Sequence, residues 1–576
     1  MTTPATERES ERFSISRISP RGRDALCIVF LGVLVLLALP GLYRYQGPPM
    51  EEGFMLAFPE QILKGNMPHR DFLHLYGPGS LWLLAIVYKV AGVTLAVERS
   101  VGLLQHLGTT FGLFFLLKPF GRRVATVAGA VSFIILIGPA GLSALAWNGA
   151  LALGICSLAV GAAAAHAEPG RRAVMLAVIS GTLAGTALLF RPDMIIAMGL
   201  AGVAMLLRQP RDRRVAMLGG GVVTLLLYIP HMVISGVGDS FNGMFMDPVF
   251  RLRPGRTLPA PPSWGSIDGF LQRVGTLRTT GWPLPMLDQS YQIYIWFWLV
   301  PISILLVLVA AWRLRRRQPQ SRLTTALWPA SLFNLALITQ AFQRPDSTHL
   351  AWVTGISFPL LIPAVLVLLD ELAERVGQRR TDASPNPSGR ILGPLRNRQI
   401  VAIALPLVIL VGVVPFYPLR TYADLVSQSF GFNRFGFPVE RYGRVFYLGD
   451  PTTARDAQRI TDELGDMLKE GQTLIVGPRD MSRTNYSDSF FYYLFPDLES
   501  GTRYIEMDPG LADTDESGLS EELAKADWLV LSDVWAGWTE PNESAVSRSQ
   551  KPNRVIDKHF CTVAEAGLFT LMKRCR

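Results

Sequence analysis

The sequences EEGF at 51–54, GNMPHRDF at 65–72 and YGPG at 76–79 form the most informative stretch of the chain. The stretch follows directly after the first long apolar segment, 25–43, which is typical of a membrane-spanning helix. It combines two adjacent carboxylates with an Arg-Asp pair and histidines. Charged side chains this close to a bilayer are costly and usually functional. Further membrane spans after this stretch would indicate the fold class, and these carboxylates are the first candidates for the function.

Apolar segments recur as far as residue 418 in this chain of 576 residues, 49% of which are hydrophobic. This recurrence is the signature of a polytopic helical membrane protein. The candidate spans are 25–43, 78–93, 100–117, 124–142, 149–167, 173–190, 194–207, 215–235, 291–312, 325–341, 350–369 and 400–418.

Arginines in the short loops predict how these spans are oriented. The arginines of residues 1–24 favour a cytoplasmic N-terminus, but crossing by every candidate would put the basic loops 118–123 and 208–214 outside. If 78–93 is an interfacial or re-entrant helix, about eleven spans remain, and the short basic loops become cytoplasmic. The longer loop 236–290 also carries arginines and would face outside, which is the contrary observation.

This topology predicts a cytoplasmic tail at 1–24, a transmembrane domain at 25–418 and an extracytoplasmic α/β domain at 419–576. The tail precedes an uncharged span without a small-residue cleavage signal, which is typical of an uncleaved anchor. The net charge of +9 lies in the loops, and no nucleic-acid-binding motif accompanies it. The four cysteines include no CxxC pair, which excludes a zinc ribbon.

Residues after 419 alternate between helical and strand patterns, which indicates a small α/β domain with a mostly parallel sheet. The expected strands are 473–477, 503–507 and 528–532, and the expected helices are 454–470 and 521–526. A closing hairpin turns at Ala566-Gly567, with Cys561 and Cys575 on either side, where they could pair in an oxidising compartment. The aromatic cluster at 490–495 fits a core better than a sugar-stacking surface.

Glu51 and Glu52 begin a short amphipathic pattern that predicts a helix at 52–64, ended by Gly65. Acids at a helix N-terminus are favoured by its dipole, so simple capping is the structural alternative. A carboxylate here could also act as general base toward an acceptor hydroxyl, an effect worth about 10²–10⁴ in rate. Asp71 is a further candidate acid, next to Arg70.

Basic residues near the predicted outer span ends could hold a phosphate leaving group, because guanidinium binds two phosphate oxygens at once. For each of them, snorkelling to lipid headgroups is the alternative. These residues are Arg70, Lys89, Arg99, Arg191 and Arg344.

Two Arg-Pro-Asp turns each join two predicted spans at the outer face. We call Arg191-Pro192-Asp193 the first corner and Arg344-Pro345-Asp346 the second corner. Each could hold an arginine and a supporting or acceptor-binding aspartate in fixed geometry, or be only a tight turn. His349 follows Asp346 by one helical turn and, with Glu51, could bind a divalent cation, so metal dependence stays open.

The segments ILKGNMPHRDFLHLYGPGS (62–80), YKVAG (88–92) and VERSVGLL (97–104), after an acidic pair, resemble the GT-C glycosyltransferases. Protein O-mannosyltransferases and aminoarabinose transferases belong to that superfamily, and QRPDSTH (343–349) is similar to a feature of its bacterial members. The resemblance covers 25–370 in architecture.

If the resemblance holds, it implies a first outer loop with a catalytic acid and interfacial helices. Glu51 takes the place of the catalytic aspartate, and Arg99 that of an arginine after the interfacial helix. The family's Asp-Glu is Glu-Glu here, which leaves open whether Glu51 or Glu52 is the base. The implied reaction is inverting transfer of a sugar from a polyprenyl-phosphate donor to a hydroxyl of a glycan, lipid or protein.

A transporter or flippase of lipid-linked glycans is the competing function, and a non-catalytic protein of the same fold is a third. A transporter is expected to carry charges in mid-span and internal repeats. Here the charges gather at outer span ends, which favours the enzyme. The arginine and alanine bias is typical of a GC-rich bacterial source, so the expected location is the bacterial plasma (inner) membrane.

Overall fold

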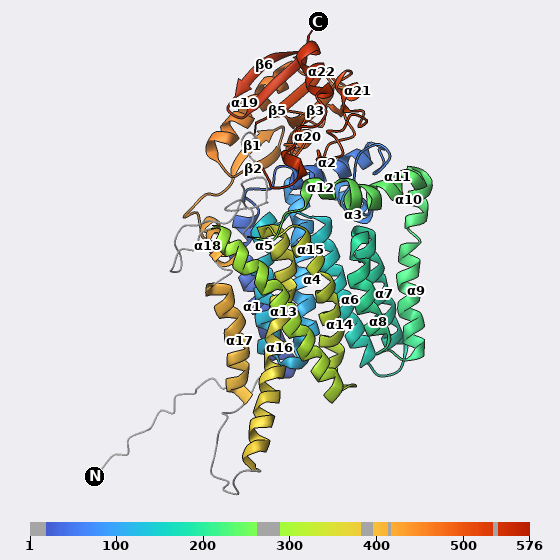
Figure 1. The fold of residues 1–576 in the computed structure, drawn as a ribbon, viewed down its shortest axis with the longest axis vertical. Helices are drawn as coiled ribbons and strands as arrows, with labels where there is room; N and C mark the ends of the chain where they lie inside the picture. Colours follow the sequence, from blue (N-terminus) through green and yellow to red (C-terminus); the bar gives the residue numbers. More distant parts are fainter. Residues whose placement is uncertain (1–18, 262–288, 382–394, 413–415, 534–538, 576) are drawn as a thin grey trace, which may run out of the picture.

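The computed structural model describes residues 19–261, 289–381, 395–412, 416–533 and 539–575. Long helices form a bundle, and a smaller domain of strands and short helices covers one end of it (Figure 1). Over the described ranges, eight helices are long and apolar enough to cross a membrane. The prediction of a polytopic helical bundle with a C-terminal α/β domain is confirmed.

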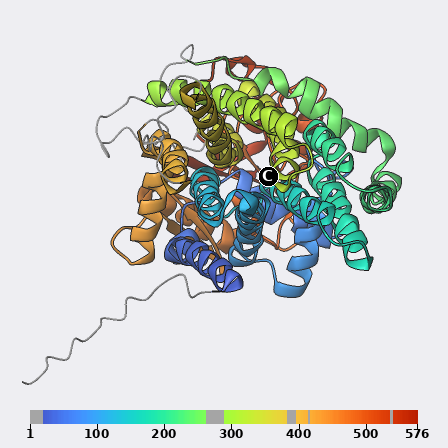
Figure 2. The same ribbon diagram turned by 90° about the horizontal axis from the view of Figure 1, so that it is seen from below.

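The long helices of the bundle are α1 (Pro20–Leu42), α4 (Leu95–Leu117), α5 (Arg122–Ala140), α6 (Ala146–Ala165), α7 (Arg171–Phe190), α9 and α10 (Arg211–Leu225 and Tyr228–Ser235), α13 (Gln289–Arg317) and α16 (Ser347–Thr381). Three shorter helices run alongside them in Figure 1: α8 (Ile195–Leu206), α14 (Arg322–Ala336) and α17 (Leu395–Gly412). Seen end-on in Figure 2, α1 and the orange helices α17 and α18 (Phe416–Ser429) lie on one side of the bundle.

Small residues let neighbouring helices approach closely, as is common in membranes. A Cβ atom added at Gly181 of α7 would lie 1.8 Å from the Met217 carbonyl oxygen of α9. One added at Gly220 would lie 2.4 Å from the Val178 carbonyl oxygen. Neither position has room for a side chain, so these glycines set the spacing of α7 and α9.

The first loop, residues 43–94, contains two short helices, α2 (Glu51–Leu63) and α3 (Gly79–Ala91). The predicted helix at 52–64 is confirmed, and Gly65 ends it with φ 97°. With 13 residues, α3 is about 20 Å long, whereas the hydrocarbon core is about 30 Å thick. Both helices lie at the junction with the small domain (Figure 1), as expected for interfacial helices.

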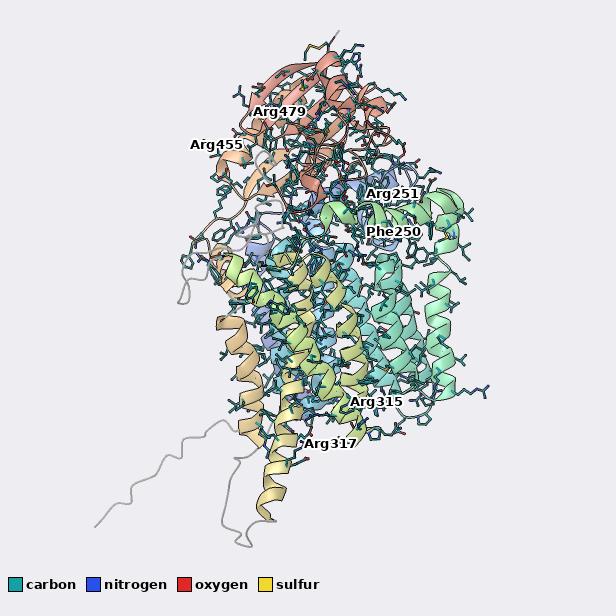
Figure 3. All side chains as sticks on the ribbon, in the orientation of Figure 1. Phe250, Arg251, Arg315, Arg317, Arg455 and Arg479 are labelled. Atoms are coloured by element: carbon teal, nitrogen blue, oxygen red, sulfur yellow. A yellow bond between two sulfur atoms is a disulfide. The ribbon has the colours of Figure 1, made fainter. Side chains whose placement is uncertain are left out.

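The arginine-rich loops gather at the opposite end of the bundle. Arg213 donates to the Ala167 carbonyl oxygen at 3.0 Å, and Arg317 pairs with Glu374 at 2.9 Å. Arg208 donates to the Pro319 carbonyl oxygen, so three of these loops touch one another. Figure 3 places Arg315 and Arg317 at the end away from the small domain. The separation of basic loops from the first loop agrees with the predicted topology.

The C-terminal domain contains a hairpin and a mixed five-stranded sheet with the order β4-β3-β5-β7-β6. Its strands are β1 (Phe437–Arg441), β2 (Arg444–Leu448), β3 (Thr473–Pro478), β4 (Glu499–Ser500), β5 (Trp528–Ser532), β6 (Phe560–Ala566) and β7 (Phe569–Arg574). Its helices are α19 (Pro451–Met467), α20 (Phe490–Leu494), α21 (Leu519–Leu523) and α22 (Lys551–His559). Between α10 and the domain lie α11 (Val237–Phe241), a π-helix (Asn242–Arg251) and α12 (Arg253–Arg256), and α15 (Ile338–Gln343) precedes the second corner.

Two expectations for this sheet are wrong. The sheet is not mostly parallel, because the closing hairpin places β7 antiparallel to both β5 and β6. Residues 503–507 form no strand, because their backbone bonds elsewhere: the Arg503 carbonyl oxygen accepts from the Leu73 N–H at 2.9 Å. The Ile505 carbonyl oxygen accepts from the hydroxyls of Ser487 and Ser489. These bonds tie the segment to the first loop and to its own domain.

The hairpin at Ala566-Gly567 and the strand at 528–532 are confirmed, and the strand expected at 473–477 extends by one residue to Pro478. Cys561 and Cys575 form a disulfide with Cα atoms 5.3 Å apart. All aromatic residues of the 490–495 cluster are buried, which confirms the core interpretation.

The C-terminal domain is fixed to the first loop through α2. Arg444 pairs with Glu60 at 2.8 Å, and the Phe490 N–H donates to the Pro49 carbonyl oxygen at 3.3 Å. A Cβ atom added at Gly53 would lie 2.4 Å from the Phe490 nitrogen. Glycine at 53 therefore lets α20 contact the first turn of α2, where Glu51 and Glu52 lie.

Candidate functional site

The two adjacent glutamates at the start of α2 lie in different surroundings. Glu52 is fully buried, and its two oxygens accept from Arg99 Nε at 2.8 Å and Arg99 Nη2 at 2.7 Å. Arg99 Nη1 donates to the carbonyl oxygens of Leu42, Tyr43 and Tyr45. This bidentate pair connects the end of α1, the first loop and α4. The guanidinium group of Arg99 thus donates its hydrogen bonds to protein groups.

Glu51 is half-buried and lies in the first turn of α2, which contacts α20 of the C-terminal domain at Gly53. Burial, followed by the charges of Asp488 and Glu51, raises the pKa of Tyr486 well above its usual value. The Tyr486 hydroxyl donates to Asp488 at 2.8 Å, and burial raises the pKa of Asp488 to about 6. The sequence places Tyr486 and Asp488 in the segment between β3 and α20.

A second acidic pair from the C-terminal domain, Glu506 and Asp508, lies on the same side of Glu51. Burial, then the charges of Asp508 and Glu51, raises the pKa of Glu506 well above its usual value. Asp508 accepts from Arg256 Nε at 3.0 Å. Burial thus favours the protonated form of Glu506, whereas Asp508 is paired with the Arg256 cation.

The first corner packs between aromatic rings. Arg191 is buried and binds Asp193 through two hydrogen bonds of 2.9 and 2.7 Å. Its guanidinium carbon lies 4.2 Å from the Tyr76 ring centre and 4.9 Å from that of Trp147. The side chain of Asp193 is 38% exposed and also accepts from Gln340 at 3.3 Å. This corner holds a cation whose carboxylate partner is accessible.

The second corner is closed by the C-terminal domain. Arg344 donates to Asp346 at 2.8 Å and to the two oxygens of Glu540 at 3.0 and 2.6 Å. A further bond of 2.6 Å reaches the Arg256 carbonyl oxygen. Asp346 accepts from His349 at 2.7 Å, and although burial opposes it, the charges of His349 and Arg344 lower the pKa of Asp346.

A row of aromatic contacts joins the two corners. Trp147, which lies beside Arg191, has its ring centre 5.3 Å from that of Trp352. Trp352 in turn lies 4.9 Å from the ring centre of His349. The corners, separated by about 150 residues in sequence, therefore share one region beneath the C-terminal domain.

Three other predicted site residues lie apart from the corners. Arg70 and Asp71 pair at 2.7 Å on the surface, and Arg70 also donates to the Ile234 carbonyl oxygen. Lys89 is exposed on α3, roughly 15 Å along the helix from its first turn. Within the described ranges, no hydrogen bond, ion pair or ring contact joins these three side chains to the corners.

Asp346 and His349 bond to each other, and no group of three His, Cys, Asp or Glu side chains in the described residues is arranged to hold a metal ion.

Sequence reasoning missed the residues that the C-terminal domain contributes to this region. They are Tyr486, Asp488, Glu506, Asp508 and Glu540, with Arg256 from α12. These residues are separated from Glu51 by hundreds of positions and follow no motif. For Tyr486, Asp488, Asp508 and Glu540, the available signal was their place after predicted strands, where α/β domains carry ligand-binding residues.

No family model matches the sequence, and no curated protein matches it. Among solved structures, ArnT from Cupriavidus metallidurans bound to undecaprenyl phosphate is similar over 95% of this chain and 98% of ArnT, with TM-score 0.50 and 14% identity. The chain shares the fold of ArnT. The Archaeoglobus fulgidus oligosaccharyltransferase is similar over 95% of this chain and 73% of its own, with TM-score 0.45 and 11% identity. The similarity to ArnT thus covers most of the chain.

Proposed function

We propose that this protein is a membrane glycosyltransferase that moves a sugar from a polyprenyl-phosphate donor to an acceptor hydroxyl, with inversion. The shared fold supports this class, and ArnT is known with undecaprenyl phosphate bound. The acceptor is a glycan, a lipid or a protein.

The observation that carries the proposal is the division of roles between Glu51 and Glu52. Glu52 is paired with Arg99 in the protein interior, whereas Glu51 is only half-buried and its charge acts on Tyr486 and Glu506 of the C-terminal domain. A general base must reach a substrate proton, and a carboxylate locked by a bidentate arginine cannot. Glu51 is therefore our candidate for the base.

In the proposed reaction, the oxygen of the acceptor hydroxyl attacks the anomeric carbon of the sugar. Glu51 accepts the proton of that hydroxyl during the attack. The bond between that carbon and the phosphate oxygen breaks, and the lipid phosphate leaves with the electron pair. Burial raises the pKa of Glu506, which favours its protonated form beside the proposed base.

Arg191 is the corner arginine best suited to stabilise the leaving phosphate. Its partner Asp193 is 38% exposed, so a phosphate can replace that carboxylate at moderate cost. The partners of Arg344 are only 1% exposed, and we assign Arg344 a positioning role between the second corner and Glu540. Lys89, exposed on α3, is a second phosphate contact only if the lipid extends along that helix.

The positive-inside rule gives the orientation of the proposed enzyme. The basic loops gathered at the end opposite the C-terminal domain face the cytoplasm, and Glu51 faces the other side of a bacterial plasma membrane. An outer-face site is consistent with a lipid-linked donor, since nucleotide sugars are absent there.

A sugar-transfer assay in sealed membrane vesicles of known orientation tests this function. The vesicles contain the protein and radiolabelled polyprenyl-phosphate sugars. We expect label to move from lipid to acceptor when the outer face of the membrane is accessible, and no transfer in vesicles without the protein. Movement of intact labelled lipid across the bilayer without any transfer contradicts the proposal and supports a flippase.

A further inference from the structure

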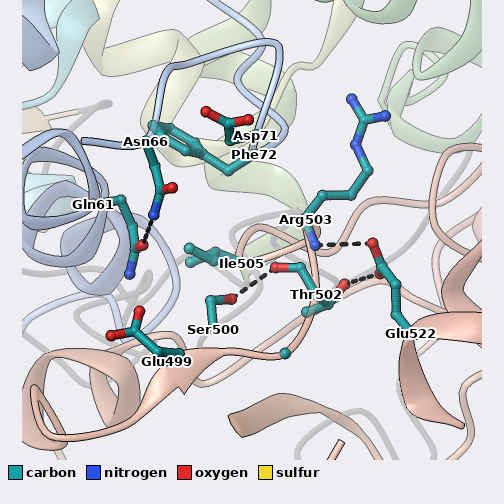
Figure 4. A pocket seen from close by; sticks show the side chains of 11 residues that line it. Gln61, Asn66, Asp71, Phe72, Glu499, Ser500, Thr502, Arg503, Ile505 and Glu522 are labelled. Carbon is teal, nitrogen blue, oxygen red and sulfur yellow. Dashed lines mark hydrogen bonds between the residues drawn. The ribbon is translucent and has the colours of Figure 1, made fainter. Parts of the chain in front are cut away.

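A polar cavity of about 260 Å³ lies between the first loop and the C-terminal domain (Figure 4). The first loop contributes Gln61, Asn66, Asp71 and Phe72, and the segment from Glu499 to Ile505, with Glu522, forms the opposite side. Neither Glu51 nor a corner arginine lines it. The cavity is therefore separate from the proposed transfer site.

Two amide side chains present hydrogen-bonding groups to this cavity. Asn66 Nδ2 donates to Gln61 Oε1 at 2.7 Å, which holds the two amides side by side (Figure 4). Within the described part of the chain, the Gln61 amide nitrogen and the Asn66 amide oxygen make no further hydrogen bond. One donor group and one acceptor group are thus fixed in place, as a sugar hydroxyl requires.

The carboxylates of the cavity already have partners. Asp71 pairs with Arg70 at 2.7 Å, and Glu499 pairs with Lys64 at 3.3 Å. Each of these two anions has a cation beside it, so their charges are balanced locally. A phosphate or a free amine would leave one of these charges without its partner, whereas a neutral ligand would not.

The remaining carboxylate is held by its own domain. Glu522 accepts from the Thr502 hydroxyl at 2.5 Å and from the Arg503 N–H at 3.2 Å. These two bonds fix the position of the Glu522 carboxylate. A ligand hydroxyl would donate to this carboxylate in addition to them. Phe72 and Ile505 are buried beside these polar groups and give the cavity an apolar part.

Amides, carboxylates and hydroxyls beside an apolar surface match the chemistry of a sugar ring, which presents hydroxyls at its edge and C–H groups on its faces. A volume of 260 Å³ is slightly below the range of about 300–1,000 Å³ usual for drug-sized ligands. It is thus suited to a single ring rather than to a longer chain.

We propose that this cavity binds one uncharged sugar residue of a glycan, at a site distinct from the site of transfer. The proposal goes beyond the proposed transferase activity and does not require it, since binding here involves no residue of the reaction.

Saturation-transfer NMR on the full chain in lipid nanodiscs, free of sugar-based detergent, tests this site. The uncharged probes are glucose and N-acetylglucosamine, and the charged probes are glucuronate, glucose 6-phosphate and glucosamine. We expect signals from at least one uncharged probe in the millimolar range, stronger than from any charged probe.

Variants at the two edges of the sheet provide a matched pair. Glu499 of β4 is 51% exposed and pairs with Lys64, and Glu565 of β6 is 60% exposed and pairs with Arg479. Glu499→Arg introduces a long cation beside the cavity and should weaken sugar binding about tenfold or more. Glu565→Arg, at the far edge, should leave it unchanged.

Glu51→Gln should also bind the uncharged sugar as the native protein does, which separates this site from the transfer reaction. The proposal is overturned if no uncharged probe binds the native protein, if a charged probe binds more tightly than both uncharged probes, or if Glu499→Arg and Glu565→Arg bind equally. Absence of transfer by the native protein, with sugar binding intact, would count against the transferase alone.

Discussion

Arg99 and Glu52 form a bidentate ion pair, with nitrogen–oxygen distances of 2.8 and 2.7 Å, in which both side chains are at most 2% exposed. Removal of one partner from an ion pair in the protein interior is strongly destabilising, because the other charge is left buried without compensation. In this fold the pair joins α2 to α4, directly beside the glutamate proposed to do chemistry.

Glu52→Gln should therefore destabilise the protein by about 3–5 kcal/mol, since Arg99 would keep its charge in a dry site. A shift of thermal unfolding in detergent measures this effect. Glu51→Gln, one residue away and half-buried, is the matched control and should unfold close to the native temperature. Equal stability of the two variants would show that the pair contributes little.

The two corner arginines should respond differently to loss of charge. Arg191→Gln leaves Asp193 exposed to solvent, so we expect a folded protein whose affinity for undecaprenyl phosphate falls about tenfold or more. Arg344→Gln leaves Asp346 and Glu540 buried, which should cost about 3–5 kcal/mol of stability. Unfolding curves and lipid-phosphate titrations distinguish them. A stable Arg344→Gln variant that alone loses phosphate binding would reverse the assigned roles.

The disulfide between Cys561 and Cys575 closes a loop with a sequence separation of 14. Replacing both with serine should lower the stability of the C-terminal domain by about 3 kcal/mol in the chain-entropy model. Cys27 and Cys156 are free, so their prior replacement removes background labelling. In that background, intact cells should take up a thiol reagent at 561 and 575 only after reduction. Labelling without reductant would argue against an outer location.

The raised pKa of Asp488 predicts that the stability of the protein depends on pH. Burial raises its pKa to about 6 from 3.8, so the folded protein holds this proton more tightly than the unfolded chain. Its stabilising contribution is therefore complete below 3.8 and is lost as the pH rises through about 6.

Asp488→Asn keeps an acceptor for the Tyr486 hydroxyl but cannot ionise. Relative to the native protein, its stability should increase by up to about 3 kcal/mol between about pH 4 and pH 7. Thermal unfolding of both proteins across this pH range measures the difference. A difference that does not change with pH would mean that Asp488 ionises normally in the fold.

Local patterns predicted the local structure well. The 3.6-residue period and Gly65 located α2, the short apolar strands at 473–478 and 528–532 were found from their residues, and the spacing of Cys561 and Cys575 around a turn predicted their pairing. Each of these features depends on neighbours in sequence, so the sequence contains the information directly.

Long-range pairing could not be predicted in the same way. The pattern offered Arg99 as a phosphate ligand, whereas it lies against Glu52, 47 positions earlier. Residues 503–507 have the composition of a strand, but bonding of the Arg503 carbonyl oxygen to Leu73 keeps them out of the sheet. The first turn of α2 contacts α20 at Gly53, and no local pattern encodes this contact.

The role of Glu51 as the base is the central claim, and sugar transfer by Glu51→Gln in membranes tests it most directly. With the protein folded as the control above requires, the account predicts that transfer from a polyprenyl-phosphate sugar falls by about 10²–10⁴. Transfer by this variant at the native rate would contradict the account.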